Sequence, residues 1–358
     1  MADSYNISDL AANETGAPHP GTPFYVFVWV TILNAVVFLV GLVGNVLVIV
    51  VVTKVREMKT STNFCLMNLS IADLLVLLIC QPAALLEFYG QERWVLGDFM
   101  CKLVTFSENL VTHASITIIV AVSCGRYYAV CDPLRTYSTG SRSKTMITMI
   151  CVWVVVIAVT SPFLFMASTR QTLHHVDQEM VDVCETPIIY TWQKIYTVFI
   201  FFAFFVIPLA MLMYMYSVII HHVLRENTVA GNDSGKLQAH KSRKQLVSML
   251  IGIIVLFFVC ILPFRIVALC MIFTPVNLVG LMGMEAFLNL IAFARVLVYI
   301  NSAGNPIIYN IYSQKFRNAF KKCLGLRAAS NRGYMNRNAT VTSYTFVKPT
   351  AGVQSDSV

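Results

Sequence analysis

Seven long apolar segments restrict this chain to very few folds. They lie at roughly residues 24–52, 62–88, 98–130, 143–166, 190–222, 242–272 and 283–311. Each is as long as the ~20 residues with which a helix crosses the hydrocarbon core of a bilayer. Only 12% of the residues are charged, about half the share found in soluble proteins. A soluble protein would have to bury all seven segments in one domain, so the sequence predicts an all-α membrane protein with a seven-transmembrane helix bundle over residues 24–311.

Basic residues predict the orientation of this bundle. The arm at residues 1–23 has no Lys or Arg, whereas both are common after the first, third, fifth and seventh segments. Cytoplasmic loops carry an excess of Lys and Arg, so we expect an extracellular N-terminal arm, a cytoplasmic tail and a place in the plasma membrane. The net charge of +8 then reflects topology and gives no reason to expect nucleic acid as a partner.

Two features of the predicted outer side indicate covalent modification. Asn6 and Asn13 each begin an N-glycosylation sequon in the N-terminal arm. Cys101 starts the third segment and Cys184 lies in the connection at 167–190. Both cysteines are on the oxidising side of the membrane, which favours a disulfide between them.

Several ionisable residues lie inside the apolar segments, where they are costly and usually functional. They are Asp73, Glu108, Arg126, Arg265 and Arg295. Glu108, Ser115 and Arg126 are 7 and 11 residues apart, so they share one helix face. In the seventh segment three polar residues are likewise spaced by seven: Arg295, Ser302 and Tyr309. Polar side chains at successive depths indicate a bundle with a wet interior.

Such a bundle is typical of a channel or transporter, an intramembrane enzyme, or a signalling receptor. Many transporters show internal repeats, and the two halves of this chain show no duplication. The tetrapeptide VLGD at 95–98 lacks the first glycine of a GxGD protease motif, and His113 is the only histidine well inside a segment. These observations favour a receptor and leave a transporter as the alternative from another class.

One short motif per segment carries a family resemblance. In order they are Gly44-Asn45, NLSIADL (68–74), WVLGDFMC (94–101), Trp153 with Pro162, Pro208 with Tyr216, FFVCILPF (257–264) and NPIIY (305–309). The chain thus resembles the rhodopsin-like, class A G-protein-coupled receptors over residues 24–323. The resemblance implies a receptor, not an enzyme, that binds an extracellular ligand and activates heterotrimeric G proteins.

The resemblance also implies a cation pocket in mid-membrane. Its residues would be Asp73, Asn45, Ser115, Asn301, Ser302 and Asn305. One carboxylate with several neutral oxygens suits a weakly held hard cation such as Na⁺. A polar cluster satisfied by water alone is the alternative. No other cofactor is expected.

At the inner end the resemblance implies a coupling and switching set. Its residues are Arg126, Tyr127, Leu134, Tyr216, Tyr309, Ile116, Pro208 and Phe257. Three departures from the family pattern stand out. Gly125 replaces the acid that usually restrains Arg126, Arg243 replaces the usual acid of the sixth segment, and Ile261 replaces a tryptophan. We therefore expect signalling without ligand, unless Asp132 or a backbone carbonyl restrains Arg126 instead.

The segment SQKFRNAFKKC (313–323) has Phe316 and Phe320 on one side and basic residues on the other. It predicts a short amphipathic helix at 312–325 on the cytoplasmic membrane surface, with Cys323 as a palmitoylation site. The remaining 326–358 are rich in Ser, Thr, Asn and Gly, which is typical of a disordered tail. Receptor kinases, arrestin and a PDZ domain at the C-terminus are its expected partners.

The candidate ligand-binding residues are Glu108, Arg265, Arg295, Phe264, Tyr299, Asn109, Gln81 and Glu285. Two buried arginines disfavour a small cationic ligand, and guanidinium groups suit carbonyls and carboxylates. The third segment and LPFR (262–265) resemble neuropeptide receptors of the thyrotropin-releasing-hormone, growth-hormone-secretagogue and neuromedin type. They predict a peptide ligand, with a small amine or acid as the alternative. An ion pair between Glu108 and Arg295 is the structural alternative for those two residues.

Overall fold

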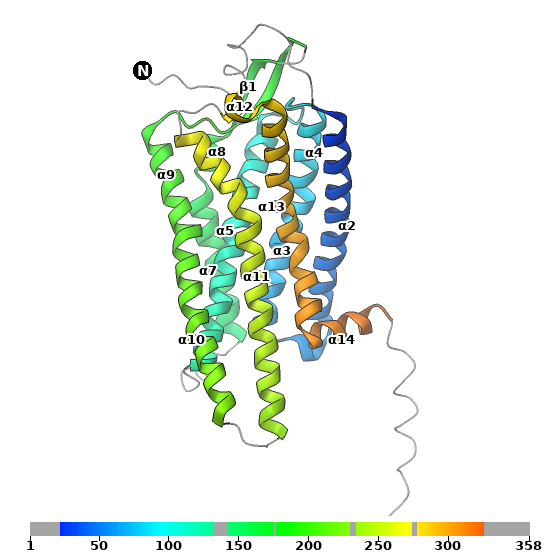
Figure 1. Cartoon of the computed structure of the whole chain (residues 1–358), viewed down its shortest axis with the longest axis vertical. Coiled ribbons are helices and arrows are strands. Elements are labelled where there is room, and N and C mark those ends of the chain that lie inside the picture. Colours follow the sequence, from blue (N-terminus) through cyan, green and yellow to red (C-terminus); the bar gives the residue numbers. More distant parts are fainter. Residues whose placement is uncertain (1–21, 132–141, 175–176, 230–233, 274–277, 326–358) are drawn as a thin grey trace, which may run out of the picture.

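The computed structural model of the chain describes residues 22–131, 142–174, 177–229, 234–273 and 278–325 (Figure 1). The predicted positions Asn6, Asn13 and Leu134 and the tail at 326–358 lie outside these ranges. Within the described residues, seven helices are long and apolar enough to cross a membrane, which confirms the predicted fold class. They span Phe24–Lys54, Ser61–Tyr89, Gly97–Cys131, Ser143–Met166, Thr191–Arg225, Arg243–Phe273 and Met284–Tyr312.

The helices lie side by side in one bundle, numbered here as spans 1 to 7 (Figure 1). Spans 1, 3, 6 and 7 contain α2 (Phe24–Lys54), α5 (Gly97–Cys131), α11 (Ser234–Phe273) and α13 (Met284–Tyr312). Span 4 contains α7 (Arg142–Thr160) and α8 (Phe163–Met166). Span 2 combines α3 (Ser61–Leu75), η2 (Val76–Cys80) and α4 (Gln81–Tyr89). Span 5 combines α9 (Thr191–Phe201), η3 (Phe202–Val206) and α10 (Ile207–Val229). Two short helices, η1 (Arg56–Met58) and α12 (Leu278–Met282), complete the connections.

Spans 2 and 5 each contain one π-helical turn. These turns, η2 and η3, end just before Pro82 and Pro208 respectively. A proline within a helix has no N–H to donate and its ring crowds the carbonyl four residues earlier. A wider π turn relieves that crowding without ending the helix. The two prolines therefore explain where these spans depart from regular α-helix.

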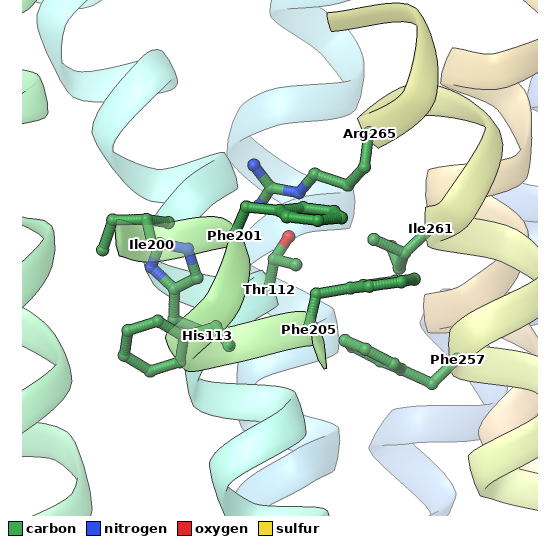
Figure 2. Close-up of a pocket in the computed structure, with 9 residues that line it drawn as sticks. Thr112, His113, Ile200, Phe201, Phe205, Phe257, Ile261 and Arg265 are labelled. Atoms are coloured by element: carbon green, nitrogen blue, oxygen red, sulfur yellow. The ribbon is translucent and has the colours of Figure 1, made fainter. Parts of the chain in front are cut away.

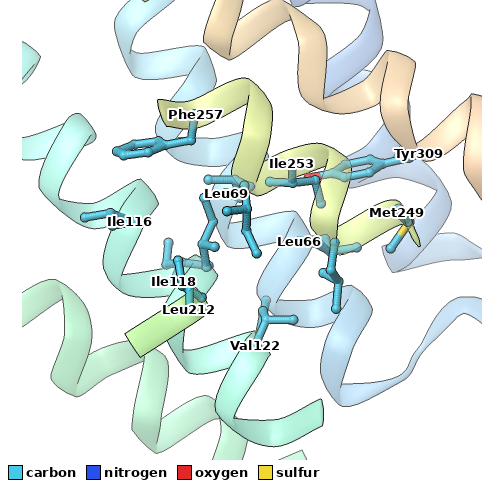
Figure 3. Packing of buried hydrophobic residues seen from close by; sticks show 14 of the residues in the cluster. Leu66, Leu69, Ile116, Ile118, Val122, Leu212, Met249, Ile253, Phe257 and Tyr309 are labelled. Carbon is cyan, nitrogen blue, oxygen red and sulfur yellow. The ribbon is translucent and has the colours of Figure 1, made fainter. Parts of the chain in front are cut away.

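The half of the bundle that ends at α14 (Gln314–Cys323) is named the inner half, and the half that carries Cys101 is named the outer half. Large apolar side chains fill the inner half. Figure 3 shows Leu66 and Leu69 of span 2 packed with Ile116 and Val122 of span 3, near Phe257 of span 6. The outer surface of the bundle is also apolar, as the exposed Val154, Val155 and Ile157 of α7 illustrate. An apolar exterior is what lipid contact requires, because hydrocarbon cannot solvate polar groups.

A two-stranded hairpin lies at the end of the bundle opposite α14 (Figure 1). Its strands β1 (Ser168–Leu173) and β2 (Met180–Glu185) pair antiparallel, with Ser168 opposite Glu185 and Leu173 opposite Met180. The predicted disulfide between Cys101 and Cys184 is present and ties β2 to span 3. From the sequence, residues 167–190 are expected only to be a connection between two spans. The strands form because the disulfide and backbone pairing hold the two halves of this connection together.

Further contacts fasten the hairpin to the bundle. The Trp94 backbone N–H donates to the Asp182 carbonyl at 2.7 Å, and the Thr169 N–H donates to Asp98 Oδ1 at 3.0 Å. Arg93 forms an ion pair with Asp177, which also contacts His174 at 2.7 Å. The hairpin is thus fixed at both strands and near its turn.

The last described element is α14 (Gln314–Cys323), as expected from its amphipathic sequence. The Ser313 hydroxyl caps its N-terminus by accepting the Phe316 N–H at 3.4 Å. Phe316 and Phe320 are buried, and the Phe316 ring lies 5.2 Å from that of Tyr309. The apolar face of α14 therefore packs under span 7 while its basic face stays exposed.

We predict that Cys101→Ala and Cys184→Ala each abolish the ligand response and destabilise the outer end of the protein. Removing a native disulfide typically costs about 2–5 kcal/mol. Thermal unfolding of the purified variants and peptide mapping under non-reducing conditions would measure this. Cys151→Ala, which changes an exposed free cysteine of α7, is the control. Variants as stable and as responsive as the wild type would contradict the prediction.

Candidate functional site

The outer half of the bundle contains a charged cluster formed by spans 2, 3, 6 and 7. Arg295 Nη1 of span 7 donates to Glu87 Oε2 of span 2 at 2.7 Å. Glu108 of span 3 accepts a hydrogen bond from the Tyr299 hydroxyl at 3.3 Å. The structural alternative raised from the sequence, an ion pair between Glu108 and Arg295, does not occur among the described residues. Glu87 takes its place because it lies at the outer end of span 2, within reach of Arg295.

Arg265 of span 6 has a different environment from Arg295. Among the residues that the structure describes, none forms an ion pair or hydrogen bond with its guanidinium. The negative charge of Glu108 acts on it from a longer distance. A cation inside a membrane protein is costly without a close partner. Arg265 is thus the interior cation of this cluster that lacks a close counter-charge in the described chain.

A small cavity lies beneath Arg265, which forms part of its lining. Its volume is about 10 Å³, room for roughly one water molecule, and its lining includes Thr112, His113, Phe205, Phe257 and Ile261. Figure 2 shows Arg265 above the Phe201 ring and Phe257 on the inner side of the cavity. Arg265 and Phe257 come from the same helix, two turns apart. A ligand group that binds Arg265 from the outer end of the bundle would therefore lie above the aromatic rings of Phe201, Phe205 and Phe257.

His113 also lines this cavity, although it is not among the ligand-binding residues predicted from the sequence. Its Nδ1 lies 3.0 Å from the Thr160 hydroxyl, and its ring stacks on Phe204 with centroids 4.3 Å apart. Its Nε2 is buried and has no hydrogen-bond partner among the described residues. The signal that could have identified it is its position, as the one histidine well inside an apolar segment.

The other predicted ligand residues lie in separate environments. Gln81 is buried and donates to Asn34 Oδ1 at 2.9 Å, so it joins span 2 to span 1. Asn109 donates to the Thr105 carbonyl at 3.0 Å. Glu285, at the outer rim, accepts from the Tyr25 hydroxyl at 2.5 Å. Phe264 is half-buried beside Arg265 in sequence but does not line the cavity.

The residues of the predicted cation pocket lie at mid-depth, and all six are buried. Asn305 Nδ2 donates to Asp73 Oδ2 at 2.9 Å, and Asn45 Nδ2 donates to the Ser302 carbonyl at 3.0 Å. Four oxygens of this set have no hydrogen-bond partner among the described residues: Asp73 Oδ1, Asn45 Oδ1, Ser115 Oγ and Asn305 Oδ1. Asn301 and Ser302 complete the set. Unpaired buried oxygens around one carboxylate fit a hard cation with water.

At the inner end of span 3, Arg126 is half-buried. The Tyr216 hydroxyl lies 3.3 Å from the Ser123 hydroxyl, and Tyr216 also interacts electrostatically with Arg126. No described acidic residue forms an ion pair with Arg126. A Cβ atom added at Gly125 would have no described atom within 4 Å. The position therefore has space for the acidic side chain that the sequence lacks.

The remaining residues of the switching set lie in the packed interior. Ile116, Pro208, Phe257 and Tyr309 are buried, and the Tyr309 hydroxyl has no partner among the described residues. Tyr127 is half-buried against Tyr128, with ring centroids 5.7 Å apart. Ile261 is also buried, at the cavity beneath Arg265. An isoleucine thus occupies the position where the family resemblance predicts a tryptophan.

Comparisons with known proteins agree with this arrangement. The family model described as 7 transmembrane receptor (rhodopsin family) matches residues 44–309. The chain is 32% identical over 301 residues to the QRFP-like peptide receptor of Branchiostoma floridae, covering 83% of this chain and 77% of that one. It is 31% identical over 307 residues to growth hormone secretagogue receptor type 1 of Mus musculus, covering 85% and 82%. It is 28% identical over 338 residues to the neuropeptide CCHamide-1 receptor of Drosophila melanogaster, covering 92% and 66%.

The chain therefore belongs to the rhodopsin family of seven-transmembrane receptors. It is a G-protein-coupled receptor, a multi-pass membrane protein that signals and does not act as an enzyme. The family resemblance drawn from one motif per span is confirmed.

Proposed function

We propose that this receptor binds an extracellular peptide in the outer half of the bundle and activates a heterotrimeric G protein at the inner half. The single observation that carries the ligand class is Arg265, a half-buried cation of the outer half without a close counter-charge in the described chain. A backbone carbonyl, a C-terminal amide or a carboxylate of a peptide would supply the missing acceptor. The names of the relatives in amphioxus and fly support the same class.

Glu108 gives the site a second, opposite preference. Its carboxylate accepts only the 3.3 Å hydrogen bond from Tyr299 among the described residues, so a basic or N–H group of the ligand can approach it. The Glu87–Arg295 pair is already neutralised. A peptide carries both hydrogen-bond acceptors for Arg265 and donors for Glu108, whereas a small amine or a small acid could bind only one of these two residues. This difference favours a peptide over a small ligand.

The outer end of the bundle is proposed to be extracellular. The Cys101–Cys184 disulfide lies at this end and α14 at the other, and disulfides persist in oxidising surroundings. Glycans at Asn6 and Asn13 fit the same orientation. On the cytoplasmic side, Cys323 is exposed at the end of α14 and available for palmitoylation. Receptor kinases, arrestin and a PDZ domain would act on the tail at 326–358.

The path between the two ends runs along span 6. Arg265 and Phe257 both line the cavity under the ligand site, and Phe257 packs against Phe258 and the apolar cluster below it. Ile116 belongs to the same cluster, as does Tyr216, beside Arg126. A ligand that pulls on Arg265 would therefore shift span 6 against spans 3 and 5. Close-packed cores move between discrete arrangements, which lets a small shift reach the G-protein side.

Arg265→Gln is predicted to weaken peptide activation by at least about thirtyfold, because truncating one partner of a buried charged contact costs roughly 2–5 kcal/mol. A screen of amidated and free-acid peptides on receptor-expressing cells, read separately as calcium and cyclic AMP, would first supply the agonist. Arg265→Lys, which keeps the charge without the planar fork, should lie between wild type and Arg265→Gln.

The same screen tests the alternatives. Activation by small amines or acids but by no peptide would contradict the proposed ligand class. Solute flux through the reconstituted protein without any G-protein activation would indicate a transporter.

The pocket around Asp73 is proposed to hold Na⁺ with water. Its unpaired oxygens would be the ligands, and Na⁺ would supply the positive charge that a buried carboxylate lacks. If so, NaCl should raise the unfolding temperature of the purified receptor more than choline chloride does at the same concentration, by mass action. Asp73→Asn should remove this difference. A difference that persists in Asp73→Asn would exclude the site.

Gly125→Glu is predicted to lower signalling in the absence of ligand. A carboxylate at this position would restrain Arg126 by a charge-assisted hydrogen bond worth about 1.5–3 kcal/mol, which shifts the resting equilibrium at least about tenfold. Basal nucleotide exchange at matched surface density is the measurement. Gly125→Gln is the matched control, because it fills the same space without the charge. A basal signal in Gly125→Glu equal to that of Gly125→Gln would contradict the prediction.

A further inference from the structure

The outer hairpin carries a buried histidine just after β1. The side chain of His174 is 4% exposed, and its backbone N–H donates to the Glu179 carbonyl at 2.8 Å. Its Nδ1 lies 2.7 Å from Asp177 Oδ1 within the hairpin. Its Nε2 lies 2.9 Å from the Gln91 carbonyl, in the connection between spans 2 and 3 (residues 90–96). The ring of His174 therefore joins the hairpin to a segment more than 80 residues away in the sequence.

Both ring nitrogens of His174 face hydrogen-bond acceptors. A backbone carbonyl can accept a hydrogen bond but cannot donate one, so Nε2 must carry a proton toward Gln91. The Asp177 carboxylate forms an ion pair with Arg93, and an ionised carboxylate can only accept, so Nδ1 must carry a proton as well. Only the imidazolium form of histidine has a proton on both nitrogens. The contacts of His174 are therefore those of a positively charged ring.

The charges around the ring are compatible with this form. Among the described residues, the hairpin turn and the connection carry the carboxylates of Asp177, Glu179 and Glu92 and the guanidinium of Arg93. Arg93 Nη2 lies 3.5 Å from His174 Nδ1, and Asp177 lies against both cations. In the neutral ring with its proton on Nε2, a lone pair of Nδ1 would point at the carboxylate 2.7 Å away. The imidazolium form replaces that repulsion by a charge-assisted hydrogen bond.

The connection that His174 contacts has a strained backbone. Gln91 and Glu92 have φ angles of 52° and 77°, in the left-handed region that residues other than glycine rarely adopt. Such a conformation is costly and persists only where surrounding contacts impose it. The Glu92 N–H donates to the Glu87 carbonyl at 3.0 Å, and Glu87 is the ion-pair partner of Arg295. The segment that His174 holds is thus continuous with the outer end of span 2 and with the candidate ligand site.

We propose that His174 is a proton-dependent anchor of the hairpin, through which the pH outside the cell regulates the ligand site. Histidine ordinarily changes its charge between pH 5 and 8. The protonated ring satisfies Asp177 and the Gln91 carbonyl together, whereas loss of a proton at higher pH removes one of these hydrogen bonds. The stabilisation is therefore present on the acid side and is lost as the pH rises. The regulatory part rests on the proposed orientation and ligand site.

Hydrogen exchange of the purified full-length receptor without agonist tests the anchor itself. Exchange of the amides in β1, β2 and residues 90–96 would be compared at pH 6 and pH 8, after correction for the intrinsic pH dependence of exchange. Opening in the wild type should be about tenfold more frequent at pH 8, as expected for loss of one charge-assisted hydrogen bond. His174→Gln, whose side chain does not titrate, should open equally at both pH values. Asp177→Asn should also lose most of the difference.

Two further variants separate His174 from other titrating groups. His221→Gln changes an exposed histidine near the inner end of span 5 and should keep the tenfold ratio of the wild type. Glu92→Gln should keep it as well. Equal opening of the wild type at pH 6 and pH 8 would overturn the proposal. So would a wild-type ratio that persists in His174→Gln, or one that disappears in Glu92→Gln but not in His174→Gln.

The regulatory part is tested by the dissociation of a labelled peptide agonist taken from the screen. Dissociation from the wild type should be slower at pH 6 than at pH 8 by about the same ratio, because the anchored hairpin lies at the outer end of the bundle (Figure 1). His174→Gln should show no such difference. Dissociation independent of pH in the wild type would overturn the regulation. The exchange experiment needs no agonist, so its result is independent of whether the receptor responds to peptides.

Discussion

The 2.7 Å ion pair between Arg295 and Glu87 decides which charges in the outer half of the bundle are left without a close partner. Inside a membrane protein a charge without a partner is costly, so interior charges pair with one another or mark a functional site. Arg295 and Glu87 satisfy each other and join span 7 to span 2. Glu108 is consequently left with the Tyr299 hydroxyl, and Arg265 with a carboxylate at longer range. The ion pair thus separates a structural pair from two residues that a ligand can satisfy.

The same reasoning connects the three depths of the bundle. At the outer end, Arg265 lies above a cavity with room for about one water molecule. At mid-depth, Asp73 is surrounded by oxygens without protein partners. At the inner end, Arg126 lies beside Tyr216 and has no acidic partner in the described chain. Each depth thus holds a charge without an ion-pair partner among the described residues, and packed apolar residues such as Ile116 and Phe257 lie between these depths.

The fold could be predicted well from the sequence because a segment that spans lipid must be long, apolar and helical. Apolar segments of sufficient length become helices, and Cys101 and Cys184 lie at the ends that the topology brings together. Side-chain partners were harder to predict. The pairing of Arg295 depends on the direction in which Glu87 points from span 2. The π-helical turn η2 precedes Glu87 and changes that direction relative to a regular α-helix. The sequence predicted Gln81 as a ligand-binding residue, but its side-chain amide donates a hydrogen bond to Asn34 instead. His113 acquires its neighbours Thr160 and Phe204 only when distant helices pack together.

A double-mutant cycle between Arg265 and the peptide would test the central claim most directly. Affinities would be measured for wild type and Arg265→Gln, each with the agonist peptide and with an analogue whose C-terminal or carbonyl acceptor is replaced by a group that cannot accept a hydrogen bond. The account predicts that the two changes are strongly coupled, with an interaction energy of at least about 1.5 kcal/mol. Arg295→Gln, measured in the same cycle, should show little coupling because its partner is Glu87. Additive losses at Arg265 with every acceptor analogue, together with strong coupling at Arg295, would contradict the account.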